Sequence, residues 1–136
     1  MDFLIQRIRD YVPLDDNDIR IIQGLFESKS FSANEVIHSE GRICNRLWFI
    51  AKGLVRFSIS LDGDERTFVF RDTGSFTSDS ESFLRKTPSR RSIIAVEDTL
   101  TYSITWDNLQ KLYKEMTYGE RFGRLLVEEV FLSAVN

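Results

Sequence analysis

Hydrophobic residues recur at helical spacing near the N-terminus of the chain. The segment "FLIQRIRDYV" places its apolar residues at near-helical intervals, and Pro13 is expected to end that helix. The next segment, "LDDNDIRIIQGLF", offers Asp15 or Asp16 as an N-cap and carries a second apolar face. This pattern predicts N-terminal helices over residues 1–30.

From residue 31 to about residue 104 the hydrophobic period changes to that of strands. Val55, Phe57, Ile59 and Leu61 alternate with polar residues, which predicts one buried and one solvent-facing side. The "DGDE" segment that follows is a hairpin signal, and within this region only "SDSESFLRK" is typical of a brief helix. Short strands at regular spacing predict an antiparallel sandwich or barrel over residues 31–104.

Helical spacing returns over residues 105–136. Thr105 can cap "WDNLQKLYKEM", and the last segment repeats Phe122, Leu126 and Val130 at i, i+4 and i+8. That apolar stripe can pack back on the strands or against a helix of another chain. We expect it to pair with a second copy, because no remaining segment of this chain is available to cover the stripe fully.

Composition places the chain in a broad class. Its 136 residues are 42% apolar, which predicts one globular domain with a real core. The formal net charge of -3 argues against direct contact with nucleic acid. The N-terminal residues carry charges among the apolar ones, so they predict neither a signal peptide nor a membrane span. The single cysteine, Cys44, can form no internal disulfide, and this fits a cytoplasmic protein.

No catalytic or metal-binding arrangement emerges from the residues. His38 is the only histidine, and Cys44 alone cannot hold an iron–sulfur cluster. The neighbouring Arg42 and Arg46 leave a redox role for the thiol open, although a semi-exposed structural thiol is the simpler expectation. Asp79 is expected to cap the brief helix rather than to act as an acid or base. We therefore expect no enzyme activity and no metal.

The central part of the chain carries an ordered set of segments. "GRICNRLWFIAKGLVRF" holds a glycine, an aromatic-isoleucine strand, a Lys-Gly turn and a Val-Arg strand. It is followed by the "DGDE" hairpin, by "TGSF" and by "IIAVEDTLTYSITWDNL". In order and spacing these segments resemble the cyclic nucleotide-binding-like sensor domain of Crp/Fnr-type transcription regulators. The resemblance implies a mainly β fold, a double-stranded β-helix or jelly-roll-like β-roll, flanked by N-terminal helices and a C-terminal dimerisation helix.

The same resemblance has implications for partners. It implies a homodimer formed through the C-terminal helix, at Phe122, Leu126 and Val130. In this family a DNA-binding helix-turn-helix domain normally follows, and that domain is absent from this sequence. Contact with DNA is therefore expected only through a missing domain, and no membrane partner is expected. A truncated chain and a complete short protein both stay open.

A further implication concerns the loop between residues 73 and 92. In relatives that bind cyclic nucleotides, a Gly-Glu pair opens a ligand cassette and an Arg-Ser pair closes it. Gly74 fits the opening glycine, but Ser75 stands where the glutamate is expected, and the closing pair is reversed or shifted. The resemblance thus implies a degenerate phosphate-binding cassette. Its candidate ligand-binding residues are Gly74, Ser75, Phe76, Ser89, Arg90, Arg91 and Ser92.

These observations predict the effector-sensing and dimerisation domain of a Crp/Fnr-like transcription regulator. The expected ligand is a cyclic nucleotide or another small anion, and the alternative is a polar loop whose arginines are merely solvated. A ligand-free dimerisation scaffold and a stand-alone cyclic nucleotide-binding-like protein are the competing functions. Ligand binding would bias the arrangement of the C-terminal helices, so a ligand-dependent change distinguishes sensing from a scaffold.

Overall fold

A computed structural model describes residues 1–135, with side chains through Ser133. Two short helices begin the chain, α1 (Asp2–Arg9) and α2 (Asp16–Leu25). Asp15 is the N-cap of α2, and a reciprocal capping box with Asp18 joins the backbone N–H of each residue to the carboxylate of the other. The capping predicted from the sequence is therefore confirmed.

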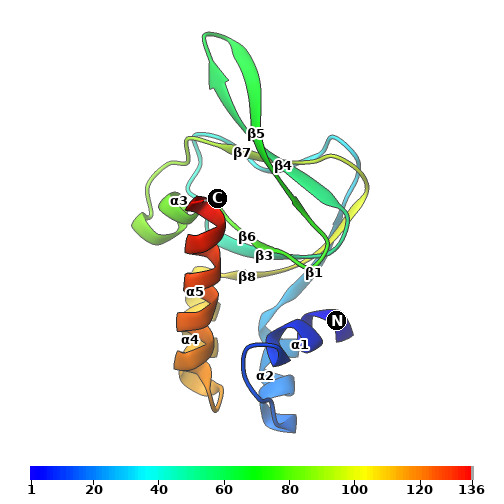
Figure 1. The fold of residues 1–136 in the computed structure, drawn as a ribbon, viewed down its shortest axis with the longest axis vertical. Helices are drawn as coiled ribbons and strands as arrows, with labels where there is room; N and C mark the ends of the chain where they lie inside the picture. Colours follow the sequence, from blue (N-terminus) through cyan, green and yellow to red (C-terminus); the bar gives the residue numbers. More distant parts are fainter. Residues whose placement is uncertain (136) are drawn as a thin grey trace.

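Eight strands form two four-stranded antiparallel sheets with the orders β1-β8-β3-β6 and β2-β7-β4-β5. The two sheets face each other as a roll, and the two N-terminal helices lie beyond the first sheet (Figure 1). This architecture confirms the mainly β, jelly-roll-like β-roll. The strands are β1 Glu27–Phe31, β2 Val36–His38, β3 Arg46–Lys52, β4 Leu54–Leu61, β5 Asp64–Asp72, β6 Phe76–Thr77, β7 Ser92–Ala95 and β8 Thr99–Thr105.

Strand β1 corrects the expected N-terminal boundary. Helix was predicted as far as residue 30, but the helical part ends at Leu25 and residues 27–31 pair with β8. Only Phe31 of this strand is buried, so its sequence carries almost no hydrophobic alternation. The strand is specified by its pairing with β8, which lies about seventy residues further along the chain.

The β4–β5 hairpin follows the prediction at its tip and departs from it along β4. The turn is made by Asp62 and Gly63, which both adopt positive φ (53° and 84°), and the hairpin projects beyond the roll (Figure 1). A register shift lies between Phe57 and Ser58. Beyond it Ser58 is buried and Leu61 is exposed, so the predicted alternation is wrong for that half of the strand.

The roll has two hydrophobic cores because β3 is buried on both faces. Leu47 and Phe49 point toward the helices, whereas Trp48 and Ile50 point into the space between the sheets. A continuous apolar run is the sequence signature of such a strand. Strand β3 thereby ties the helical layer to the β-roll.

Three helices complete the fold: α3 (Ser80–Arg85), α4 (Trp106–Glu115) and α5 (Gly119–Val135). The Thr105 hydroxyl caps α4 by accepting a hydrogen bond from the Asn108 N–H at 3.2 Å, as predicted. Helices α4 and α5 run side by side, and the end of α5 lies close to α3 and the roll (Figure 1). No helix of residues 1–135 is long and apolar enough to cross a membrane. The predicted helical region 105–136 extends one residue beyond the described part.

Two of the three residues predicted to contact a second copy are instead part of the core. Phe122 and Leu126 are 0% and 2% exposed. The Phe122 ring packs edge-on against Tyr11, with ring centroids 5.6 Å apart, and also contacts Phe76. The stripe on α5 therefore packs against its own chain. Val130 is half-buried and borders the cavities described below.

Candidate ligand-binding site

The loop between β5 and α3 begins with a main-chain anchor. Gly74 adopts a φ of +91°, and its N–H donates to the Ile50 carbonyl at 2.7 Å. The Ile50 N–H donates in turn to the Ser75 carbonyl at 2.9 Å. Gly74 and Ser75 thus hold the loop against β3, and together with Arg7 and Glu129 they border a small cavity of about 100 Å³.

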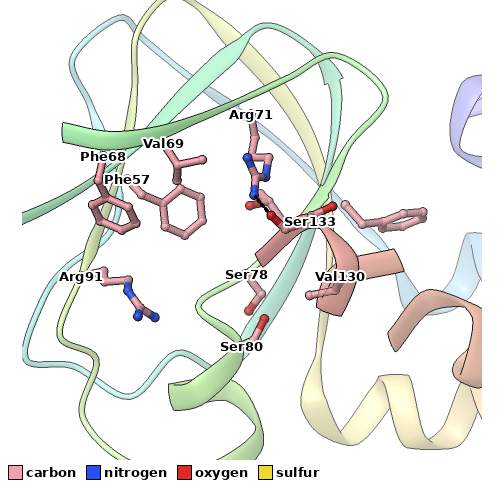
Figure 2. A pocket seen from close by; sticks show the side chains of 11 residues that line it. Phe57, Phe68, Val69, Arg71, Ser78, Ser80, Arg91, Val130 and Ser133 are labelled. Atoms are coloured by element: carbon pink, nitrogen blue, oxygen red, sulfur yellow. Dashed lines mark hydrogen bonds between the residues drawn. The ribbon is translucent and has the colours of Figure 1, made fainter. Parts of the chain in front are cut away.

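A second cavity, of about 290 Å³ and termed the main cavity, opens beside this anchor. It lies between the β4–β5 hairpin, the start of α3 and the last turns of α5. Figure 2 shows the Arg91 guanidinium directed into this space and the Arg71 guanidinium directed toward Ser133 at its edge. Aromatic and aliphatic side chains form one wall and hydroxyl groups form another (Figure 2). The lining residues are Phe57, Phe68, Val69, Arg71, Phe76, Thr77, Ser78, Ser80, Arg91, Val130 and Ser133.

A buried carboxylate forms an ion pair with one of the two arginines, Arg91. Asp79 is 2% exposed and accepts a hydrogen bond from Nη1 of Arg91 at 2.8 Å. The Ser89 hydroxyl also donates to this carboxylate, and Ser89 Oγ accepts from the Arg91 N–H at 3.2 Å. These contacts satisfy the buried charge and fix the start of β7 against the start of α3.

The geometry corrects the role expected for Asp79. The residue occupies the N-cap position of α3, but its side chain makes no capping hydrogen bond. A cationic donor is a stronger partner for a buried carboxylate than a backbone N–H of a six-residue helix, so the side chain turns to Arg91. A carboxylate therefore does lie beside the cassette arginine, but it belongs to Asp79 and not to the position of Ser75.

The structure brings together only part of the predicted set. Phe76 and Arg91 line the main cavity, whereas Ser89 lies buried behind the ion pair. Arg90 points to solvent with its side chain 84% exposed, and its guanidinium lies 4.0 Å from the Glu81 carboxylate. Ser92 accepts a hydrogen bond from the Glu40 N–H at 2.9 Å through its hydroxyl, which makes it a loop support.

Sequence reasoning missed Arg71 and the end of α5. Arg71 donates to the Phe70 carbonyl at 3.0 Å and to the Ser133 carbonyl at 3.3 Å. The available signal was strand periodicity, because Val69 and Arg71 are two residues apart on β5 and both line the cavity. No local signal places Ser133 there, because the direction of α5 depends on its packing against the rest of the chain.

The remaining reactive side chains have structural surroundings. Cys44 is 1% exposed, which corrects the expected semi-exposed thiol, and its Sγ lies 3.4 Å from Ser78 Oγ. His38 is buried in β2, and this burial is the main cause that lowers its pKa, with the charge of Asp79 opposing the shift and that of Arg42 adding to it. Residues 1–135 contain no cluster of metal-ligating side chains.

Comparison with known proteins identifies the family of this fold. The sequence model for the cyclic nucleotide-binding domain matches residues 28–116, from β1 to the end of α4. The chain belongs to the cyclic nucleotide-binding domain family. This finding confirms the resemblance inferred from the ordered segments around β3, β4 and β8. None of the curated proteins compared matches this sequence.

Solved structures share the fold of this cyclic nucleotide-binding domain at low sequence identity. A cyclic nucleotide-binding domain from Methylobacillus flagellatus aligns with a TM-score of 0.78 and 16% identity, over 97% of this chain and 78% of its own. The sensor domain of the transcriptional regulator DNR from Pseudomonas aeruginosa aligns with a TM-score of 0.76 and 7% identity, over 97% and 86%. The catabolite activator protein from Thermus thermophilus aligns with a TM-score of 0.72 and 20% identity. That alignment covers 92% of this chain, which spans only 59% of the Thermus protein.

The ion pair beneath the cavity should show energetic coupling. We predict that Arg91→Gln lowers the free energy of unfolding by about 2 kcal/mol, because it leaves the buried Asp79 carboxylate without its cation. Asp79→Asn should cost about 1–2 kcal/mol, and the double variant should cost at least about 1 kcal/mol less than the sum. Urea-unfolding curves of the three variants and the wild type measure this coupling.

The exposed neighbour pair supplies the matched control. Glu81→Gln removes a carboxylate 4.0 Å from the solvent-exposed Arg90, so it should change stability by no more than about 0.5 kcal/mol. Additive effects of the Asp79 and Arg91 substitutions would contradict the assigned contact.

Proposed function

We propose that this chain is the effector-sensing and dimerisation domain of a Crp/Fnr-type transcription regulator. One observation carries the proposal: the last turns of α5 form a wall of the cavity of about 290 Å³, through Val130 and Ser133. A molecule in that cavity contacts the roll and the helix together. The family match and the likeness to a transcriptional regulator's sensor domain support this reading.

The geometry suggests how occupancy would reach α5. Arg71 links the cavity to the helix, because its guanidinium donates to the Ser133 carbonyl. One turn earlier on α5, Arg7 pairs with Glu129 at 2.5 Å, and the Tyr11 hydroxyl donates to the same carboxylate. An effector that binds one position of α5 better than another shifts the population between the two positions. Binding, rather than catalysis, is the proposed activity.

A cyclic nucleotide is one candidate effector among small anions. Its support is the family match and the presence of a carboxylate and an arginine, Asp79 and Arg91, within the cassette. The two groups are bound to each other, so a phosphate would have to compete with Asp79 for Arg91. We therefore propose that the phosphate-binding cassette is degenerate because its arginine, Arg91, is already paired with Asp79.

The same ion pair favours a second candidate function. Asp79 supplies Arg91 with the negative charge that a ligand phosphate would otherwise bring. A domain that satisfies its own cassette in this way can hold its fold without an effector. The alternative function is therefore a ligand-free dimerisation scaffold.

The surface proposed for dimerisation lies on α5 beside α3 and α4. Val127 and Phe131 lie one turn apart and are 53% and 66% exposed, and the nearby Leu84 is 62% exposed. They border an apolar groove of about 420 Å³ that also includes Trp106 and Tyr113. We propose that the same surface of a second copy covers them, in place of the stripe predicted from the sequence. DNA contact would require a further domain.

Ligand binding should raise the thermal stability of the chain. We predict that at least one anion in a panel of cyclic AMP, cyclic GMP and small organic carboxylates raises the unfolding midpoint by several degrees. A ligand at 100 times its dissociation constant stabilises the folded state by about 2.7 kcal/mol. Differential scanning fluorimetry across the panel gives the measurement, with sodium chloride at matched ionic strength as the control. A flat response to the entire panel would favour the scaffold.

Charge on the exposed face of α5 should dissociate the dimer. We predict that Val127→Glu combined with Phe131→Glu gives a folded monomer, because burying two carboxylates in an apolar interface is costly. Multi-angle light scattering measures the mass, and circular dichroism checks the fold. Arg124→Gln, which alters an exposed i,i+4 pair with Glu128, is the control that should stay dimeric. A double variant of unchanged dimeric mass would move the interface elsewhere.

A further inference from the structure

The two arginines of the main cavity differ in how their charge is compensated. Arg91 is bound to the buried Asp79 carboxylate at 2.8 Å. The ion pairs found within residues 1–135 do not include Arg71, whose guanidinium donates only to the carbonyls of Phe70 and Ser133. Figure 2 shows the Arg71 guanidinium directed toward Ser133 at the edge of the cavity. Among the residues that the structure describes, Arg71 is therefore the cavity cation without a carboxylate partner.

Binding of an anion costs more at Arg91 than at Arg71, because the partner that each guanidinium gives up is different. Recruiting Arg91 would withdraw the cation from Asp79 and leave a buried carboxylate with the Ser89 hydroxyl alone. Recruiting Arg71 exchanges a neutral carbonyl at 3.3 Å for a charged oxygen, which forms a stronger hydrogen bond. A carboxylate can also accept two parallel bonds from one guanidinium. The balance favours Arg71 as the group that holds the anion.

The remaining walls define the body of the ligand. Phe57, Phe68 and Val69 form an apolar side, and Phe76 with Val130 closes it near Arg71. The volume of about 290 Å³ lies at the lower end of the range for small-molecule pockets. These walls suit a compact aromatic or aliphatic group, and they offer no buried carboxylate free to accept from a sugar hydroxyl, since the Asp79 side chain is occupied.

We propose that the cavity takes a compact organic carboxylate with an apolar body, held by Arg71 and not by Arg91. This assignment rests on the proposed effector-sensing function and names the ligand class and the anchor for the same cavity. The hydroxyls of Ser78 and Ser80 lie on the opposite wall. Ser78 donates its proton to the Arg46 carbonyl at 2.8 Å and can still accept from a polar substituent of the ligand, whereas the Ser80 hydroxyl can accept or donate.

The anchor residue is also the contact that holds the end of α5. The final carbonyls of a helix have no intrahelical partners, and the Arg71 guanidinium satisfies that of Ser133. A ligand carboxylate on Arg71 competes with this carbonyl. The contact of Glu129 with Arg7 is outside the main cavity and is left intact. Binding is therefore expected to loosen α5 beyond Glu129 while the earlier turns stay packed.

Isothermal titration calorimetry on the full chain tests the anchor, with 3-phenylpropionate, cyclic AMP and inorganic phosphate as probes. We expect 3-phenylpropionate to bind the wild type, and Arg71→Gln to weaken binding at least tenfold. Arg90→Gln, a change of a solvent-exposed arginine in the same loop, should alter it less than threefold. Asp79→Asn with Arg91→Gln removes the ion pair without leaving a buried charge, and should weaken binding less than fivefold.

Hydrogen exchange separates an anchor from a merely structural arginine. Saturating 3-phenylpropionate should speed amide exchange in residues 130–133 of the wild type. In Arg71→Gln exchange there should already be fast and should not respond to the probe. If Arg71→Gln fails to fold, Arg71→Lys takes its place, with binding expected to be weakened at least threefold because a lysine cannot form the paired contact.

The opposite outcomes are distinct. Cyclic AMP binding that survives Arg71→Gln and is lost in the Asp79/Arg91 double variant would overturn the Arg71 assignment while leaving the sensing function in place. Absence of heat and of exchange changes with 3-phenylpropionate would overturn the proposed ligand class. Sensing itself would fail only if the wider thermal panel were also without effect.

Discussion

The ion pair between Asp79 and Arg91 is the interaction on which the cassette loop depends. It joins the residue that opens α3 to the residue that precedes β7, so both ends of the loop are fixed at one buried point. Such a pair is costly to bury and far more costly to break, because a carboxylate that is 2% exposed would be left without its cation. The fold therefore keeps Arg91 at the cavity wall while neutralising its charge. An incoming anion is therefore expected to bind at Arg71 instead.

The shape of the cavity also depends on where the end of α5 lies. Core packing of Phe122 and Leu126 sets the direction of the helix, and this direction brings Val130 and Ser133 to the cavity. The hydrogen bond from Arg71 to the Ser133 carbonyl then joins the roll to the helix. A ligand that replaced this hydrogen bond would bias the end of α5 while the packed part of the helix stayed in place. Val127 and Phe131 lie on the exposed side of the same stretch, so a bias at the cavity would reach the proposed dimer surface.

Local rules predicted most of the elements and little of the site. The N-caps Asp15 and Thr105 were predictable because capping depends on a few adjacent residues. Strand β1 was not, because four of its five residues are exposed and its pairing partner is distant in sequence. The predicted capping by Asp79 was wrong for a related reason. Asp79 occupies an N-cap position, but Arg91, twelve residues away, supplies a stronger hydrogen-bond partner for its carboxylate. The placement of Arg71 beside Ser133 depends on three-dimensional packing across more than sixty residues, which no periodicity records.

We expect Arg91 to be held by Asp79 in solution and so to be unavailable to a ligand phosphate. Nitrogen-15 NMR of the arginine side chains tests it directly, with the exposed Arg90 as the internal reference. We predict slow rotation about the Arg91 Cζ–Nε bond, with separate Nη resonances that merge in Asp79→Asn, and rapid averaging for Arg90 in both proteins. Averaged Arg91 resonances in the wild type, matching those of Arg90, would contradict the account and return Arg91 to the position of a free phosphate anchor.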